Sequence, residues 1–247
     1  MSNLNPVSVE NLTISYRQVE ALRNINLTIA PGRVTGIIGP NGAGKSTLIK
    51  GMLGLISAQF GWVSWGDKSL AQQRDRVAYV PQRSQIDWTY PATVWDVVMM
   101  GRVKKTGWFR PFSRISRVKA QSCLERVGMG NLCDRPIGQL SGGQQQRVFL
   151  ARSLAQEADI FFFDEPFVGV DQKTEAIIFD IFRELADENK IVMVVNHDLG
   201  ESINNFDDLV LLNKSLIAFG AREQVLREEN LSFAYGGGVS FYGHKAA

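Results

Sequence analysis

The sequence contains little that would bind a metal ion, cross a membrane or form disulfides. Only two histidines and two cysteines occur among its 247 residues. Cys123 and Cys133 lack the spacing of a metal or redox motif, so we expect two unpaired thiols in a reducing compartment. The apolar runs Ile160–Phe163, Ile191–Val195 and Leu209–Leu212 are far shorter than the roughly 18 residues of a membrane-spanning helix. If this protein works at a membrane, we expect other chains to supply the spans.

The chain also lacks a strong excess of charge of either sign. Its formal net charge is +2, which argues against a globally basic surface for nucleic acid. Residues 1–10 show no basic region followed by an apolar stretch, so we expect no secretory signal. Hydrophobic residues make up 45% of the chain, and a chain of this length can bury a large core without disulfides. These properties predict a globular protein of one or two domains.

Apolar periodicity predicts alternating strands and helices. Strands are predicted at 7–16, 25–29, 34–38, 76–80, 160–163 and 191–196, with a final hairpin at 209–212 and 216–219. Helices are predicted at 46–55, 94–100, 117–127, 142–156 and 172–189. Because apolar strands joined by helices imply a sheet buried on both faces, we predict an α/β core. The core would span about residues 1–84 and 151–235, a helical insert about 85–150, and a flexible tail 236–247.

A glycine-rich loop lies between the predicted strand 34–38 and the helix that follows it. Gly39–Ser46 fits the pattern G-x-x-x-x-G-K-S in the strand–loop–helix context that a phosphate-binding loop requires. A chance glycine-rich turn is the alternative. Backbone N–H groups and the helix dipole would face the phosphates, Lys45 would neutralise them, and the Ser46 hydroxyl would ligate Mg²⁺. The predicted nucleotide-binding residues are Gly39, Pro40, Asn41, Gly42, Ala43, Gly44, Lys45, Ser46 and Thr47.

Two carboxylates follow the apolar strand 160–163. Asp164 would hold Mg²⁺ through water at the strand tip, and Glu165, one residue later, faces another way. Glu165 would polarise a water for in-line attack on the γ-phosphate. A solvated strand end before a turn at Pro166 is the alternative, and it is disfavoured in a chain with a phosphate loop.

A second anion site is predicted at Leu140–Arg147. A pair of glycines opens the helix there, with Ser141 as its N-cap, and a helix N-terminus attracts anions. An ordinary capped helix is the alternative. One chain needs only one phosphate loop, so a second anion site favours two chains that enclose nucleotide between them.

These motifs together resemble the nucleotide-binding subunit of an ABC transporter, from about Val7 to Gly237. The resemblance implies a RecA-like phosphate-loop NTPase core with an antiparallel β subdomain and an inserted helical subdomain, all in one ABC ATPase domain. The matched signature residues, which contact the γ-phosphate bound to the opposite subunit, are Ser141, Gly142, Gly143 and Gln144. Four further residues each match one position of the family. Gln82 matches the glutamine loop, which senses Mg²⁺ and the attacking water, and His197 matches the switch histidine, which contacts the γ-phosphate. Asp171 matches the D-loop aspartate at the dimer interface, and Tyr16 matches the aromatic residue that stacks on adenine.

The resemblance also implies cofactors and partners. ATP and Mg²⁺ would be the cofactors, and the Mg²⁺ ion would be held by Ser46, Gln82 and Asp164. The catalytic residues would be Glu165, His197, Gln82 and Lys45. Two copies would form a head-to-tail homodimer with ATP at the interface, at the cytoplasmic face of the plasma membrane. Permease subunits would dock near Gln82–Met100, and a substrate-binding protein would act indirectly. Trp88, Tyr90 and Trp95 are either docking contacts or packing within the insert.

Residues 80–98 and Gly169-Val170-Asp171 further resemble importers of manganese and zinc, with bacterial and cyanobacterial manganese importers the nearest in pattern. The chain shows no metal-ligand cluster of its own, so other subunits would hold the transported ion. An importer of iron or a chelate and a soluble ABC ATPase of DNA repair or translation remain alternatives. The signature loop, Glu165 and His197 argue against a kinase, a GTPase or a non-catalytic regulator.

The segment Lys104–Arg117 is basic and contains Trp108, Phe109 and Phe112. A nucleic-acid or lipid patch is one interpretation. We prefer a solvated, membrane-proximal loop of the helical insert, where its charge would suit anionic headgroups. No nucleic-acid partner is expected.

Overall fold

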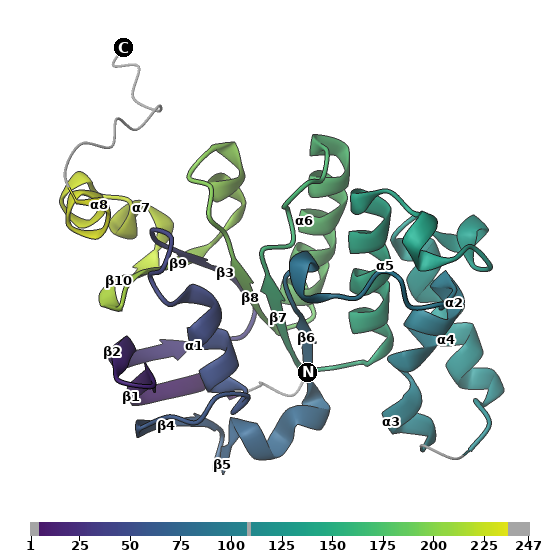
Figure 1. Cartoon of the computed structure of the whole chain (residues 1–247), viewed down its shortest axis with the longest axis horizontal. Helices are drawn as coiled ribbons and strands as arrows, with labels where there is room; N and C mark the ends of the chain where they lie inside the picture. The colour runs from purple at the N-terminus through teal and green to yellow at the C-terminus, as the bar shows by residue number, and fades with distance from the viewer. Residues whose placement is uncertain (1–4, 108–109, 237–247) are drawn as a thin grey trace. The chain divides into compact units, whose positions relative to one another are not determined.

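The computed structural model describes residues 5–107 and 110–236 (Figure 1). The chain divides into two compact units. The first unit contains the chain up to Gln73 and again from Ala186, and the second contains Arg74–Leu185. Trp108, Phe109 and residues 237–247 of the predicted tail lie outside the described residues. None of the described helices is both long and apolar enough to cross a bilayer.

An antiparallel sheet forms one part of the first unit. Its strand order is β2-β1-β4-β5, with β1 at Val7–Tyr16, β2 at Val19–Ile29, β4 at Phe60–Trp65 and β5 at Lys68–Ser69. Inward residues of β1 are buried in alternation, as its sequence pattern predicts. The sequence did not predict β4, because Phe60 and Trp62 stay exposed and interrupt the alternation of buried positions.

Parallel strands form the other part of the first unit. The central β3 (Arg33–Ile38) pairs in parallel with β8 (Ile191–Val195) and with β9 (Asp208–Asn213), and β9 pairs antiparallel with β10 (Ser215–Ala221). The predicted final hairpin is therefore confirmed. Helix α1 (Lys45–Met52) follows β3 and ends before Gly54, whose left-handed φ of 62° stops the predicted helix 46–55 early. Helices α7 (Arg222–Val225) and α8 (Glu228–Tyr235) follow β10.

In its described residues, the second unit combines two parallel strands with five α-helices. Strand β6 (Val77–Val80) pairs with the wholly buried β7 (Ile160–Asp164). The helices are α2 (Val94–Met100), α3 (Val103–Thr106), α4 (Arg114–Arg126), α5 (Gly142–Ala155) and α6 (Gln172–Asp187). The rings of Phe163 on β7 and Phe182 on α6 lie in a tilted arrangement with centroids 4.5 Å apart, and this contact packs α6 on β7.

The predicted loop Lys104–Arg117 is partly helical, which corrects the sequence-based interpretation. Helix α3 covers its first residues, and α4 begins at Arg114, three residues before the predicted start at residue 117. The cause is local, because the Ser113 hydroxyl accepts a hydrogen bond from the Ser116 backbone N–H and caps the helix.

Short 3₁₀ turns complete the fold at Leu70–Arg76, Arg83–Gln85, Gly130–Leu132, Ile137–Gln139 and Glu201–Asn205.

Candidate active site

The predicted phosphate loop closes around the ammonium group of its own lysine. Lys45 Nζ is buried and donates to the carbonyl oxygens of Gly39 at 2.8 Å and Pro40 at 3.1 Å. Gly39 has φ 146°, and a Cβ there would lie 2.1 Å from the Leu212 carbonyl oxygen. Only glycine fits this position. The backbone, with α1 starting directly behind the loop, therefore fixes the placement of the positive charge.

Two further segments support this loop from behind, and sequence reasoning missed both. The Lys214 backbone N–H, in the β9–β10 turn, donates to the Ala43 carbonyl oxygen at 2.9 Å. Tyr235, the last residue of α8, lies near the Gly39 backbone: burial raises the pKa of its hydroxyl, and the Gly39 N–H partly opposes that rise, although the buried hydroxyl forms no hydrogen bond among the described residues. Both segments are far from the loop in sequence, and no motif marks them.

Tyr16 lies at the turn between β1 and β2, where it pairs across the strands with Val19. The two side chains are 47% and 66% exposed, although both are apolar. Next to them is a cavity of about 580 Å³, lined by Gln18, Val19, Glu20, Arg23, Asn213, Lys214 and Ser215. The Arg23 backbone N–H donates to the Lys214 carbonyl oxygen at 2.7 Å, which ties this turn to the hairpin behind the phosphate loop. An exposed apolar pair beside a cavity is a suitable support for a flat aromatic ligand.

His197 lies two residues after the end of β8, and it is exposed. The Asn196 backbone N–H donates to the Ile37 carbonyl oxygen at 2.9 Å, so His197 and the phosphate loop leave neighbouring parallel strands at the same edge. The buried Asn196 side chain donates to the Asp198 carbonyl oxygen at 3.0 Å and to the Ser202 hydroxyl at 3.2 Å. Asn196 therefore fixes the turn that carries His197, a role that its identity alone did not reveal.

The two predicted catalytic residues of the second unit are in direct contact. Gln82 Nε2 donates to Glu165 Oε2 at 2.6 Å. Glu165 has φ 53°, in the left-handed region, so the chain turns sharply where β7 ends. A non-glycine residue in this region costs roughly 1–2 kcal/mol, which the surrounding contacts must offset. The strained turn sends the Glu165 carboxylate toward Gln82, while Asp164 stays buried in the strand.

Asp164 has a neighbour that sequence reasoning missed. The Tyr79 hydroxyl of β6 donates a long hydrogen bond of 3.5 Å to Asp164 Oδ2. Burial, followed by the charge of Asp164, raises the pKa of Tyr79 well above its ordinary value. Tyr79 therefore stays a neutral donor. Tyr79 pairs with Phe162 in the parallel ladder, two residues before Asp164 and on the same face.

The predicted signature loop is a helix N-terminus with a complete capping box. Ser141 is the N-cap, as predicted: its hydroxyl accepts from the Gln144 backbone N–H at 3.3 Å. The Gln144 side-chain oxygen accepts from the Ser141 backbone N–H at 2.9 Å. A Cβ on Gly143 would lie 3.1 Å from the Thr174 hydroxyl oxygen, so a small residue is needed here.

Thr174 in turn is bound by Asp171, the predicted D-loop aspartate. Asp171 accepts from the Thr174 backbone N–H at 2.9 Å and from its hydroxyl at 3.0 Å. The backbone hydrogen bond is the main reason that the pKa of Asp171 lies below its ordinary value. The structure thus brings the predicted signature and D-loop segments together through Thr174.

The glutamine loop is attached to the signature helix α5 by side chains. Arg83, next to Gln82, donates from Nε to Gln145 Oε1 at 3.0 Å, and the buried Gln145 donates to the Ile137 carbonyl oxygen at 3.1 Å. Trp88 packs edge-on against Phe149 of α5, with ring centroids 5.5 Å apart. Trp88 is half-buried and makes this packing contact, Trp95 is also half-buried, and Tyr90 is 60% exposed, so the docking role of these three residues stays a prediction.

The predicted site residues thus form two groups. Tyr16, the phosphate loop and His197 belong to the first unit, and Gln82, Asp164, Glu165, Asp171 and the signature loop belong to the second. Within residues 5–107 and 110–236, no cluster of three or more His, Cys, Asp or Glu side chains could hold a metal ion.

Comparisons with known proteins identify the family. The family model described as ABC transporter matches residues 22–168. Manganese transport system ATP-binding protein MntB of Listeria monocytogenes is 49% identical over 93% of this chain and 96% of that protein. Zinc transport system ATP-binding protein TroB of Treponema pallidum is 47% identical over 95% of this chain and 88% of that protein. MJ1267, solved in its ADP conformation as an ATP-binding cassette of an ABC transporter, superposes with TM-score 0.82 at 27% identity over 95% of this chain and 99% of that chain. The predicted family and phosphate-loop α/β fold class are therefore confirmed, and the chain belongs to the ABC transporter family.

Proposed function

We propose that this chain is the ATP-hydrolysing subunit of an importer of divalent metal ions, driven by ATP-dependent head-to-tail dimerisation. The observation that carries the enzymatic part is the 2.6 Å hydrogen bond from Gln82 to Glu165, at a strained strand end. A non-glycine residue keeps a left-handed backbone conformation only where the surrounding contacts hold it there, and such residues are often found at functional sites. An inactive cassette would have no need to hold this carboxylate in place.

ATP binding is assigned to the first unit. The phosphate loop, Gly39–Thr47, would receive the phosphates with its backbone N–H groups and with the ammonium of Lys45. The adenine ring would stack on Tyr16, with Val19 as a second apolar contact beside the cavity. His197 would contact the γ-phosphate from the edge that it shares with the loop.

Hydrolysis is assigned to Glu165. A carboxylate offers about four acceptor positions, so Glu165 can accept a proton from water while Oε2 holds the Gln82 amide. Water activated in this way would attack the γ-phosphate in line. Gln82 would orient both the carboxylate and the water.

The residues proposed for Mg²⁺ fit that ion by their chemistry. Ser46, Gln82 and Asp164 offer hydroxyl, amide and carboxylate oxygens, which Mg²⁺ prefers. Asp164 is buried at a strand end and receives the Tyr79 hydroxyl, which orients its carboxylate. Bound Mg²⁺ would neutralise phosphate charge.

Dimerisation would complete the site. Ser141, Gly142, Gly143 and Gln144 of one copy would contact the γ-phosphate held by the other, using the positive end of the α5 dipole. Asp171 would lie at the same interface. The whole chain is then a single ABC ATPase domain that contains both units.

The metal cargo is inferred from relatives. MntB and TroB are named for manganese and zinc transport, and manganese is our first choice because more of the similar relatives are named for manganese than for zinc. The permease would dock near Gln82–Met100, where the exposed Tyr90 is available as an anchor. The chain would work at the cytoplasmic face of the membrane, with a substrate-binding protein acting on the other side.

The Glu165→Gln variant tests the enzymatic part. We expect ATP affinity to remain and turnover to fall by at least about 100-fold, because general base catalysis is lost. Light scattering should then detect an ATP-dependent dimer, and Lys45→Ala should abolish nucleotide binding as a control. Turnover at the wild-type rate in Glu165→Gln would refute the assignment.

The cargo needs a separate measurement. The subunit co-purified with its permease and reconstituted in vesicles should drive uptake of manganese above zinc and iron. Uptake of iron or a chelate alone would overturn the metal assignment without affecting the ATPase assignment. Failure to associate with any membrane subunit would favour a soluble ABC ATPase.

A further inference from the structure

Positive charge is concentrated in one segment of the second unit. Residues 97–124 contain seven Lys or Arg and no Asp or Glu, whereas the whole chain carries a formal net charge of only +2. The remaining residues therefore carry a net charge of −5. An asymmetry of this size within a nearly neutral chain indicates a local partner of negative charge.

Five of these cations are displayed on the surface. Lys104, Lys105, Arg110, Arg114 and Arg117 are all exposed. In the part of the chain that the structure describes, none of the five side chains forms an ion pair. Among the described residues, no acidic side chain therefore neutralises their charge.

Exposed aliphatic side chains lie among the cations. Ile115 is 77% and Val118 is 62% exposed, one turn apart on α4. They share a side of the helix with Arg114 and Arg117, because residues three and four apart lie on one face. The opposite side is buried through Ser116, Ala120, Cys123 and Leu124. We call the surface formed by the five exposed cations, Ile115 and Val118 the basic–aliphatic face.

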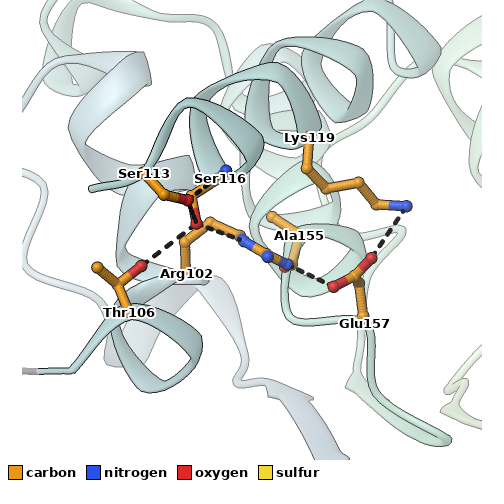
Figure 2. Close-up of polar contacts among 7 residues, drawn as sticks. All are labelled: Arg102, Thr106, Ser113, Ser116, Lys119, Ala155 and Glu157. Carbon is orange, nitrogen blue, oxygen red and sulfur yellow. Dashed lines mark hydrogen bonds and ion pairs between the residues drawn. The ribbon is translucent and has the colours of Figure 1, made fainter.

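A buried arginine holds this face in place, as Figure 2 shows. Arg102 donates to the Ala155 carbonyl oxygen at 2.8 Å and to Glu157 at 2.7 Å, and its Nε lies 3.5 Å from the Ser116 hydroxyl. Thr106 and Ser113 bond the same hydroxyl at 3.2 and 3.3 Å. The residue before α3, the first turn of α4 and the end of α5 are thus joined. A fixed surface loses little conformational entropy on binding.

We propose that the basic–aliphatic face binds the anionic lipid surface of a membrane. The cytoplasmic leaflet carries negative headgroups that attract clustered Lys and Arg. Aliphatic side chains between such cations enter the headgroup boundary, as in interfacial helices. A permease loop is a poorer partner, because cytoplasmic loops of membrane proteins are enriched in Lys and Arg. Nucleic acid is also poorer, because the exposed apolar side chains that define this face, Ile115 and Val118, have no ring to stack on bases.

Vesicle flotation of the full-length chain tests the proposal. The chain should bind vesicles of phosphatidylcholine mixed with phosphatidylglycerol, and it should not bind phosphatidylcholine alone. Binding should weaken as salt rises, because salt screens exposed charges. Each Lys or Arg near an anionic surface contributes about fivefold, so Lys104→Gln/Lys105→Gln/Arg114→Gln should lower the partition coefficient on the order of 100-fold.

Matched controls separate this face from general surface effects. Lys68→Gln removes an exposed cation elsewhere, and Phe233→Ser removes an apolar side chain that is 74% exposed on α8. Both should bind lipid as the wild type does, whereas Ile115→Ser/Val118→Ser should bind less. ATP affinity should stay unchanged in every variant, so a failure here leaves the proposed ATPase function unaffected.

Three results would overturn the proposal. Equal binding to neutral and anionic vesicles would show that the charge does not matter. Wild-type binding by the triple variant would show that another surface holds the lipid. Tighter binding to a single-stranded oligonucleotide that displaces anionic vesicles would instead assign the face to nucleic acid.

Discussion

The two units hold their functional groups by different means. In the first unit, the backbone positions the functional groups: Gly39 has no room for a side chain, and two carbonyl oxygens of the phosphate loop hold the Lys45 ammonium group. In the second unit, side chains hold one another through pairs such as Gln82–Glu165 and Arg83–Gln145. A binding loop that is held by its backbone is rigid, and this rigidity suits a ligand of fixed shape such as phosphate. Side-chain pairs can exchange partners, which suits groups that must respond to hydrolysis.

Gly39→Ala should have the largest effect, because it attacks the backbone cradle. Its Cβ would meet the Leu212 carbonyl oxygen at 2.1 Å, so the loop must shift. We expect ATP affinity to fall at least about 100-fold, since 1.4 kcal/mol corresponds to tenfold and the clash costs several kcal/mol. Isothermal titration calorimetry measures this loss.

Gly236→Ala is the matched control for Gly39→Ala. Gly236 also has positive φ, 80°, but nothing lies within 4 Å of its Cβ position. It should cost roughly 1 kcal/mol of stability and leave ATP affinity intact. If both variants bound ATP equally, steric fit at Gly39 would not determine phosphate binding.

Arg83→Ala should have a smaller effect, confined to the second unit. Loss of the bond to Gln145 frees the glutamine loop from α5, and we expect kcat to fall about tenfold with KM unchanged. Gln145→Ala should give a similar loss, and the double variant should be no worse than either single one. Gln85→Ala, an exposed residue in the same turn, should behave as the wild type. Strict additivity of the two single effects would show that the pair is not coupled.

Glu157→Gln should have the smallest effect, on stability alone. Hydrogen bonding to Arg102 holds the pKa of Glu157 below its usual 4.5. A depressed folded-state pKa contributes stability above the unfolded value and loses it as pH falls through the folded value. The wild type should therefore exceed the variant by about 1 kcal/mol near neutral pH, a modest figure because the Glu157 side chain is 39% exposed.

Urea unfolding across pH 7 to 3 measures this difference, which should shrink below about pH 4.5. Glu184→Gln, which breaks the more exposed pair with Arg126, should change stability little at any pH. A constant difference between wild type and Glu157→Gln across the whole range would contradict ionic stabilisation.

Much of the candidate site could be predicted because its chemistry is encoded locally. A phosphate loop needs glycines, a lysine and a serine at fixed spacing between a strand and a helix, and all of them lie within Gly39–Thr47. The capping box at Ser141 and Gln144 is likewise a four-residue pattern. Strands β1 and β7 were also predictable, because their burial follows the apolar pattern of their own residues.

Only the tertiary structure decided which side chains support that chemistry. Tyr79 reaches Asp164 across 85 residues, Arg83 reaches Gln145 across 62, and Arg102 reaches Glu157 across 55. No local spacing links such partners, since they meet only after strands pair and helices pack. The sequence by itself therefore determined the position of the phosphate loop and the family to which the chain belongs. The packing of each unit determined how Glu165 is held and which face carries exposed charge, because both depend on contacts between residues distant in the chain.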